Sequence, residues 1–379
     1  MSQFYEEFSN AAREGFAIGL APMEGVTDFA FRLWQSAIYV PDFFVTPFLR
    51  VTPGFEFSSV SPLFCPEIFE LRGILPVPVI PQFMGSSAVE ICRVAEEFLS
   101  SVPYVDLNCG CPASTVFRNG AGSALLRNPT DLSSFLLGCE SILGANKYSV
   151  KMRVGVHSPN EFDSLLCVIK QLHPALVTVH ARTKDEGYTG VSRWNLVEKC
   201  AREISPVAVC LSGDVVDISS LKLAREKAPS AKSAMIGRAV LSDPWVFADI
   251  ALGRCPVRTS HALVFWALAT FALFQEAQSK GYRSIFGLAE HLQPADQRLG
   301  FSEDMWRDFY YRAAAHLFGA AREPWEMLCH VKILPKTKQL FRQLDSRRIS
   351  PEARDLLRVS SLSQFFEGLW NSVLKSGEP

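Results

Sequence analysis

Hydrophobic residues in the first two thirds of the chain gather into eight short, nearly continuous runs with longer amphipathic stretches between them. Continuous apolar runs of this length are typical of parallel strands that are buried on both faces. Polar residues, proline or glycine appear near the C-terminal end of each run, so polarity returns there. The runs cover residues 17–23, 43–51, 78–83, 104–110, 148–154, 176–182, 207–213 and 233–239.

The stretches between the runs carry apolar residues at helical spacing, as in 88–100, 131–143 and 161–172. Eight alternating strand and helix units predict an α/β fold, a (β/α)8 TIM barrel. Only 52–76 departs from the pattern, and we expect an insertion with a short helix there. Because the C-terminal ends of barrel strands line the active site, strand-end polar residues become candidates. They are Gln82, Asn108, Cys111, Lys151, His180, Arg182 and Arg238.

Strand-like runs stop near residue 256, and helical patterns rich in Phe, Trp and Leu follow. We therefore predict a barrel domain over 1–255 and a C-terminal helical domain over 256–379. The longest apolar stretch, 262–274, is shorter than the ~18 residues that a bilayer span needs, so we expect a buried helix and no membrane contact. The acidic start lacks the layout of a secretory signal.

The 379-residue chain has a formal net charge of −1, but its charge is unevenly distributed. Residues 330–354 hold seven Lys or Arg against Asp345 and Glu352. This segment is either a solvated helix face or a patch that binds a phosphate backbone. Its cations include Lys332, Lys336, Lys338, Arg342, Arg347 and Arg348.

Ten cysteines are present, none in a C-x-x-C pair, and most stand in apolar surroundings. We expect reduced thiols of a cytoplasmic protein, most of them small core residues. Cys109 and Cys111 are too close for an unstrained disulfide, and no His or Cys cluster nearby completes a zinc site, so no metal is expected.

Two glycine turns follow the last two strand runs, at Gly213 and at Gly237. Barrels commonly bind a phosphate at these places through backbone N–H groups, which predicts a phosphorylated cofactor or substrate. Lys151 ends the fifth run and has three interpretations. It could form a rim salt bridge, a Schiff base as in barrel aldolases, or a positive charge beside a reduced flavin.

Five motifs together resemble the tRNA-dihydrouridine synthase family, closest to the C branch of the bacterial enzymes. They are APMEGVTD (21–28), DLNCGCPAS (106–114), VKMRVG (150–155), VTVHARTKDEGYTG (177–190) and MIGRAVLSDPWVF (235–247). The resemblance extends over nearly the whole predicted barrel, in order. It implies an FMN enzyme that reduces a D-loop uridine of tRNA to 5,6-dihydrouridine, with NADPH as reductant and position 16 as the suggested target.

The resemblance also implies residue roles. Cys111 is the catalytic cysteine, which donates a proton to C5 after hydride reaches C6 from reduced flavin. Its thiol should therefore stay protonated, while Cys109 is structural. The flavin-binding residues implied are Pro22, Met23, Gln82, Lys151, His180, Ser212, Gly213, Asp214, Gly237 and Arg238. Asn108 and Arg153 are implied to hold the uracil, and Lys332, Lys336, Lys338 and Arg342 to contact tRNA. We expect a monomer.

One position departs from the family pattern: Ser212 stands where the family commonly has Asn. A shorter hydroxyl offers fewer hydrogen bonds, which predicts weaker flavin retention. Two other protein classes stay open. One is a small-molecule flavin barrel, such as a dihydroorotate dehydrogenase or an ene-reductase of the old yellow enzyme kind. The other is a non-catalytic tRNA-binding protein.

Overall fold

The computed structural model describes residues 15–253, 260–290, 302–319, 323–324, 337–338, 340–341, 356, 358 and 360–375. The chain divides into two compact units, and each is described by itself. The barrel unit comprises Met1–Thr27, Asp42–Phe69 and Val77–Gly237, and the helical unit comprises Asp28–Pro41, Glu70–Pro76 and Arg238–Pro379.

Every strand pairing in the described part of the barrel unit is parallel. The strands are β1 (Ala17–Leu20), β2 (Phe43–Val45), β3 (Leu49–Arg50), β4 (Val79–Ile80), β5 (Gln82–Met84), β6 (Val105–Cys109), β7 (Tyr148–Arg153), β8 (Leu176–His180), β9 (Ala208–Ser212) and β10 (Ser233–Ile236). Each lies in one of the eight apolar runs, except that β5 extends one residue beyond its run to Met84, so the predicted strand positions are confirmed.

The strand pairings form a ring when β2 and β3 are counted as one run, 43–51, and β4 and β5 as the next, 78–84. β4 and β5 are separated only by Pro81, which lacks the N–H that a strand ladder needs. β4 pairs with β2, whereas β5 pairs with β3 and β6. Pairings then run from β6 through β10 to β1, and β1 pairs with β2. The predicted α/β TIM barrel is therefore confirmed.

Apolar side chains from several strands form a buried cluster within this ring. It contains Ala17, Ala21, Phe43, Val45, Ile80, Leu176, Cys210 and Met235. Gly19 makes room for the ring of Phe43, since a Cβ atom at Gly19 would overlap that ring. A small residue beside a large one lets the interior fill without voids.

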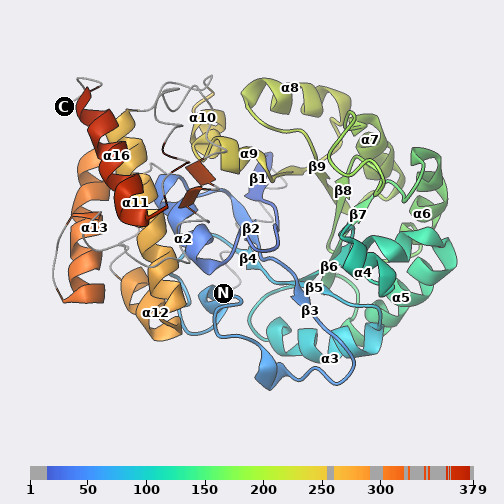
Figure 1. The fold of residues 1–379 in the computed structure, drawn as a ribbon. Helices are drawn as coiled ribbons and strands as arrows, with labels where there is room; N and C mark the ends of the chain where they lie inside the picture. Colours follow the sequence, from blue (N-terminus) through green and yellow to red (C-terminus); the bar gives the residue numbers. More distant parts are fainter. Residues whose placement is uncertain are drawn as a thin grey trace. The chain divides into compact units, whose positions relative to one another are not determined.

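Helices lie around the outside of the strands in the barrel unit (Figure 1). They are α3 (Ala88–Leu99), α4 (Ser114–Arg118), α5 (Pro129–Leu143), α6 (Phe162–Ile169), α7 (Trp194–Glu203) and α8 (Ile218–Lys227). Side-chain caps begin several of them: the Ser87 hydroxyl accepts from the Glu90 N–H, and Asp217 forms a capping box with Ser220. The predicted helices at 88–100, 131–143 and 161–172 are confirmed. The insertion holds only 3-10 turns, at Phe57–Ser59 and Pro66–Ile68.

The helical unit is organised around α11 (His261–Ser279), which contacts α2 (Phe29–Ile38), α12 (Tyr282–Glu290), α13 (Glu303–Phe318) and α16 (Leu362–Lys375). Trp34 Nε1 donates to the carbonyl oxygen of Ala267 at 2.7 Å, and Gln278 Nε2 donates to Asp28 Oδ2 at 3.0 Å. Residues 262–274 are almost all buried, as predicted. Among the described residues, no helix is long and apolar enough to cross a membrane. The predicted division of the chain at residue 255 stays a prediction.

Gly19→Ala tests the packing of the barrel interior. The added methyl group would overlap the buried Phe43 ring, so the free energy of unfolding should fall by about 1–3 kcal/mol. Gly237→Ala is the matched control, because its Cβ would lie an ordinary 3.7 Å from the Cβ of Ala21. Denaturant unfolding of flavin-free protein measures both. Equal stability of the two variants would contradict the close packing of Gly19 against the Phe43 ring.

Candidate active site

The strand register brings the predicted residues to one end of the barrel. Gln82 lies opposite Asp106 on the neighbouring strand, and Asn108 lies opposite Lys151. His180 lies between Arg153 on one side and Ser212 on the other. Because all these strands are parallel, the C-terminal ends of β5 to β9 form a continuous rim.

Gln82 and Asn108 contact each other directly. The Asn108 Nδ2 group donates to Gln82 Oε1 at 2.8 Å, and Gln82 Nε2 donates to Asp106 Oδ2 at 2.7 Å. Asn108 Oδ1 accepts the N–H groups of Gly110 at 3.0 Å and of Cys111 at 2.9 Å. Gln82 has no solvent exposure. These side chains therefore hold the turn that carries Cys111.

Cys111 is half-buried, and burial raises the pKa of its thiol, with a further contribution from Glu24. Lys151 and Arg153 act in the opposite direction without reversing the shift. The thiol is therefore protonated at neutral pH, as a proton donor requires. Cys109, two residues earlier, is fully buried, and burial raises its pKa as well.

The backbone of Cys111 is held on its other side by Ser123, whose N–H and hydroxyl donate to the Cys111 carbonyl oxygen at 3.1 and 2.7 Å. Gly122 lies so close that a Cβ atom there would be 3.0 Å from the Cβ of Cys111. Its φ of 59° is also in the left-handed region that favours glycine. The position of the thiol is thus fixed from both sides of the turn.

Lys151 forms no hydrogen bond or ion pair with residues that the structure describes. Burial lowers the pKa of its amine, and Arg153 lowers it further, while Asp106 and nearby cysteines raise it. The rim salt bridge considered for this lysine is not formed within the described ranges. A partly buried amine without a protein partner suits an anionic or electron-rich ligand.

Arg153 is only 4% exposed and is bonded to backbone carbonyls. Its Nε donates to Gly110 at 3.0 Å, and its Nη1 donates to Thr183 at 2.9 Å and Gly187 at 3.1 Å. Arg153 therefore joins the Cys111 turn to the loop between β8 and α7. Its predicted contact with uracil stays a prediction.

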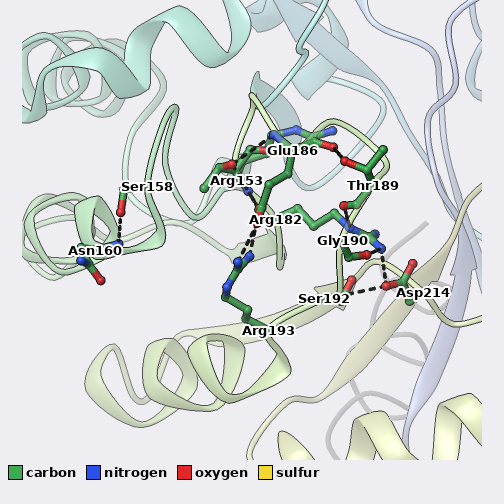
Figure 2. Close-up of polar contacts among 11 residues, drawn as sticks. Arg153, Ser158, Asn160, Arg182, Glu186, Thr189, Gly190, Ser192, Arg193 and Asp214 are labelled. Atoms are coloured by element: carbon green, nitrogen blue, oxygen red, sulfur yellow. Dashed lines mark hydrogen bonds and ion pairs between the residues drawn. The ribbon is translucent and has the colours of Figure 1, made fainter.

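The β8–α7 loop, residues 181–193, is braced at both ends by partly buried ionic contacts (Figure 2). Arg182 donates to Asp214 Oδ2 at 2.5 Å and to the carbonyl of Thr189 at 3.0 Å. Arg193 donates to both oxygens of Glu186, and this contact lowers the pKa of Glu186 to about 2. Sequence reasoning selected Arg182 and Asp214 for separate reasons and missed that they pair.

Two glycines mark the predicted phosphate site. A Cβ atom at Gly213 would lie 2.6 Å from Ser192 Oγ, and the φ of Gly213 is 109°, so a larger residue is strained there. A Cβ atom at Gly237 would lie 3.7 Å from the Cβ of Ala21 and 3.9 Å from Met23 Sδ. Gly237 thus follows β10 beside the turn that contains Pro22 and Met23.

The other predicted residues have these positions. Arg238 belongs to the helical unit and directly precedes α9 (Ala239–Ser242). Lys338 belongs to the same unit, and its side chain is partly exposed. Lys332, Lys336 and Arg342 lie outside the described residues. Within the described part of the chain, no group of three His, Cys, Asp or Glu side chains could hold a metal ion, and the cysteines are free thiols.

Comparison with known proteins gives consistent matches. Residues 19–285 match the model of the dihydrouridine synthase family. The chain is 31% identical over 242 residues to a tRNA-dihydrouridine(16) synthase of Pseudomonas putida, covering 62% of this chain and 74% of that protein. It is 32% identical over 262 residues to a tRNA-dihydrouridine(16) synthase of Cupriavidus necator, covering 66% of this chain and 79% of that protein. A human tRNA-dihydrouridine(47) synthase-like protein is 30% identical over 187 residues, covering 49% and 27%.

Asp106→Asn tests the buried carboxylate. Burial raises the pKa of Asp106 from 3.8 to about 6. The folded state therefore favours the protonated form, so the stability that this group contributes is present at acid pH and is lost as pH rises through about 6. Relative to wild type, the variant should gain about 2 kcal/mol of unfolding free energy between pH 4.5 and pH 7. Denaturant unfolding at both pH values measures the free energy of unfolding of each protein. A difference between variant and wild type that does not change with pH would contradict the raised pKa of Asp106.

Proposed function

Because the chain belongs to the dihydrouridine synthase family, we propose that it reduces a D-loop uridine of tRNA to 5,6-dihydrouridine with FMN and NADPH. The single observation that carries this proposal is the position of Cys111. Its half-buried thiol lies in the turn that follows β6, the strand on which Asn108 pairs with Lys151 of β7, and burial raises its pKa, so the thiol is protonated at neutral pH. The names of the two bacterial relatives support position 16 as the target.

The rim residues suit FMN. Lys151 offers an amine without a hydrogen-bond partner among the described residues, which suits the electron-rich edge of a reduced flavin. Gly213 and Gly237 directly follow β9 and β10, where barrels commonly bind a phosphate through backbone N–H groups. Ser212, His180, Pro22, Met23, Asp214 and Arg238 complete the proposed set. Gln82 stays a proposed contact of the flavin, and its Oε1 also accepts from Asn108 Nδ2 at 2.8 Å.

The chemistry divides between cofactor and protein. FMN, when bound at the rim and reduced by NADPH, would supply a hydride for C6 of the uracil. Negative charge then develops on C5 and the C4 oxygen of the base, and Cys111 donates the thiol proton to C5. Its raised pKa keeps that proton available at neutral pH, and solvent returns a proton to the thiolate afterwards. Asn108 and Arg153 are proposed to orient the base.

The tRNA itself is proposed to contact the helical C-terminal region. A D-loop base must be extruded to reach the barrel rim, which costs a few kcal/mol that phosphate contacts offset. The cations of 330–354 suit this role because the rest of the chain carries more Asp and Glu than Lys and Arg. We place the enzyme in the cytoplasm, where tRNA is its partner, and expect it to act as a monomer.

Cys111→Ala tests the proposed acid. Dihydrouridine formation in unmodified tRNA, measured by mass spectrometry of nucleosides, should fall by about 10²–10⁴-fold, while FMN and tRNA affinity are retained. Cys167→Ala is the control, because Cys167 is an exposed thiol away from the rim, and its activity should equal that of wild type. Free uridine, orotate and enones should be poor acceptors. Full activity of Cys111→Ala would reject the proposed role.

Charge reversal in the basic segment tests the tRNA contact. Lys336→Glu with Arg342→Glu should weaken tRNA binding and reduce the slope of log K against log salt by about 1 per residue. The matched control is Lys222→Glu with Lys227→Glu on α8, which makes the same charge change on an outer helix. Binding is measured across a series of salt concentrations. An unchanged slope in the first variant would remove this segment from the interface.

A further inference from the structure

The amide of Asn108 has only one possible orientation. Two backbone N–H groups, those of Gly110 and Cys111, lie 3.0 and 2.9 Å from the same side-chain atom. An N–H group can only donate, so that atom is the oxygen of the amide. The amide nitrogen of Asn108 therefore faces away from the turn, toward Gln82.

The same argument fixes the orientation of the Gln82 amide and identifies Asp106 as its acceptor. The Asn108 Nδ2 donor requires an acceptor, which is Gln82 Oε1 at 2.8 Å. Gln82 Nε2 must then find an acceptor of its own, and Asp106 Oδ2 lies 2.7 Å away. Gln82 is 0% exposed and Asp106 1% exposed, so water does not substitute for either partner. The hydrogen bonds form a chain with one direction, from the Cys111 turn to Asp106.

Asp106 is suited to end this chain. Its second oxygen accepts from the Ser149 hydroxyl at 2.5 Å, so both oxygens act as acceptors. A carboxylate cannot donate, which excludes the reversed chain in which Gln82 and Asn108 turn their amides around. The Gln82 backbone N–H donates to Thr46 Oγ1 at 3.0 Å, which fixes where its side chain begins. Burying a carboxylate is costly, and the hydrogen bonds from Gln82 and Ser149, together with the nearby charge of Lys151, offset that cost.

We propose that Asp106 is a positioning residue of the reaction, which acts on Cys111 through Gln82 and Asn108. The chain keeps the Asn108 oxygen on the N–H groups of Gly110 and Cys111, and it thereby holds the thiol at one place on the rim. Gln82 takes part by transmitting this orientation. The inference rests on the proposed function of Cys111 as the acid, but the chain itself is testable without turnover.

The test is a double-mutant cycle on the full-length protein. Asp106→Leu removes the acceptor, Gln82→Met removes the middle of the chain, and a third variant carries both changes. Asp106→Asn is the conservative variant, because its Oδ1 can accept from Gln82 while its Nδ2 donates to the Ser149 oxygen. The first readout is the alkylation rate of Cys111 by iodoacetamide, resolved by peptide mass spectrometry. The exposed Cys167 is the internal reference.

Each breaking variant should release the Asn108 amide and speed alkylation of Cys111 by about tenfold relative to Cys167. Cys111 in the double variant should be alkylated no faster than in either single variant, because each substitution breaks the same series of hydrogen bonds. Asp106→Asn should restore a rate near that of wild type. With tRNA as substrate, kcat should fall about tenfold in the breaking variants while KM stays within about twofold.

Three results would overturn the proposal: unchanged alkylation in folded single variants, effects that multiply in the double variant, or Asp106→Asn behaving like Asp106→Leu. If Asp106→Leu does not fold, the alkylation rates of Gln82→Met and Gln82→Glu are compared instead. A protonated glutamate can bridge Asn108 and Asp106, whereas methionine cannot. If wild-type protein does not reduce tRNA, the proposed function fails. The alkylation rates then still show whether the hydrogen bonds from Asn108 through Gln82 to Asp106 hold Cys111 in place.

Discussion

Two hydrogen bonds, from the N–H groups of Gly110 and Cys111 to the Asn108 oxygen, place the reactive thiol. Other contacts depend on that placement. Arg153 can reach the Gly110 carbonyl, and Ser123 can reach the carbonyl of Cys111, only while the turn keeps this shape. A proton donor must lie within hydrogen-bond reach of the atom it serves, so geometry precedes pKa in deciding whether Cys111 can act.

The fold makes this arrangement possible through an irregularity in the barrel. Pro81 divides one strand run into β4 and β5 and leaves no N–H for the ladder at that position. The Gln82 N–H turns instead to the side chain of Thr46. The ring of pairings still closes, because β4 and β5 each keep a partner on the neighbouring run. The break thus coincides with the residue that links Asp106 to Asn108.

Much of the fold could be predicted from hydrophobic patterning, because strands buried on both faces leave a strong signal, as in β6 to β9. The breaks at Pro81 and between β2 and β3 could not, since they depend on local hydrogen bonding. Strand-end chemistry pointed to Asn108, Cys111 and Lys151, but not to Asp106, which stands inside β6 and is recognisable only by its partners. The placement of α2 with α11 depends on packing between segments over 200 residues apart, such as the bond from Trp34 to Ala267.

The most direct test of the account is the visible absorption spectrum of freshly purified protein, recorded without oxygen before and after NADPH and again after unmodified tRNA. The account predicts an oxidised-flavin band that NADPH bleaches and tRNA restores, because the reduced cofactor passes its hydride to the base. A protein that stays colourless and does not take up added FMN would contradict it. The serine at position 212 would then mark a real loss of the flavin site.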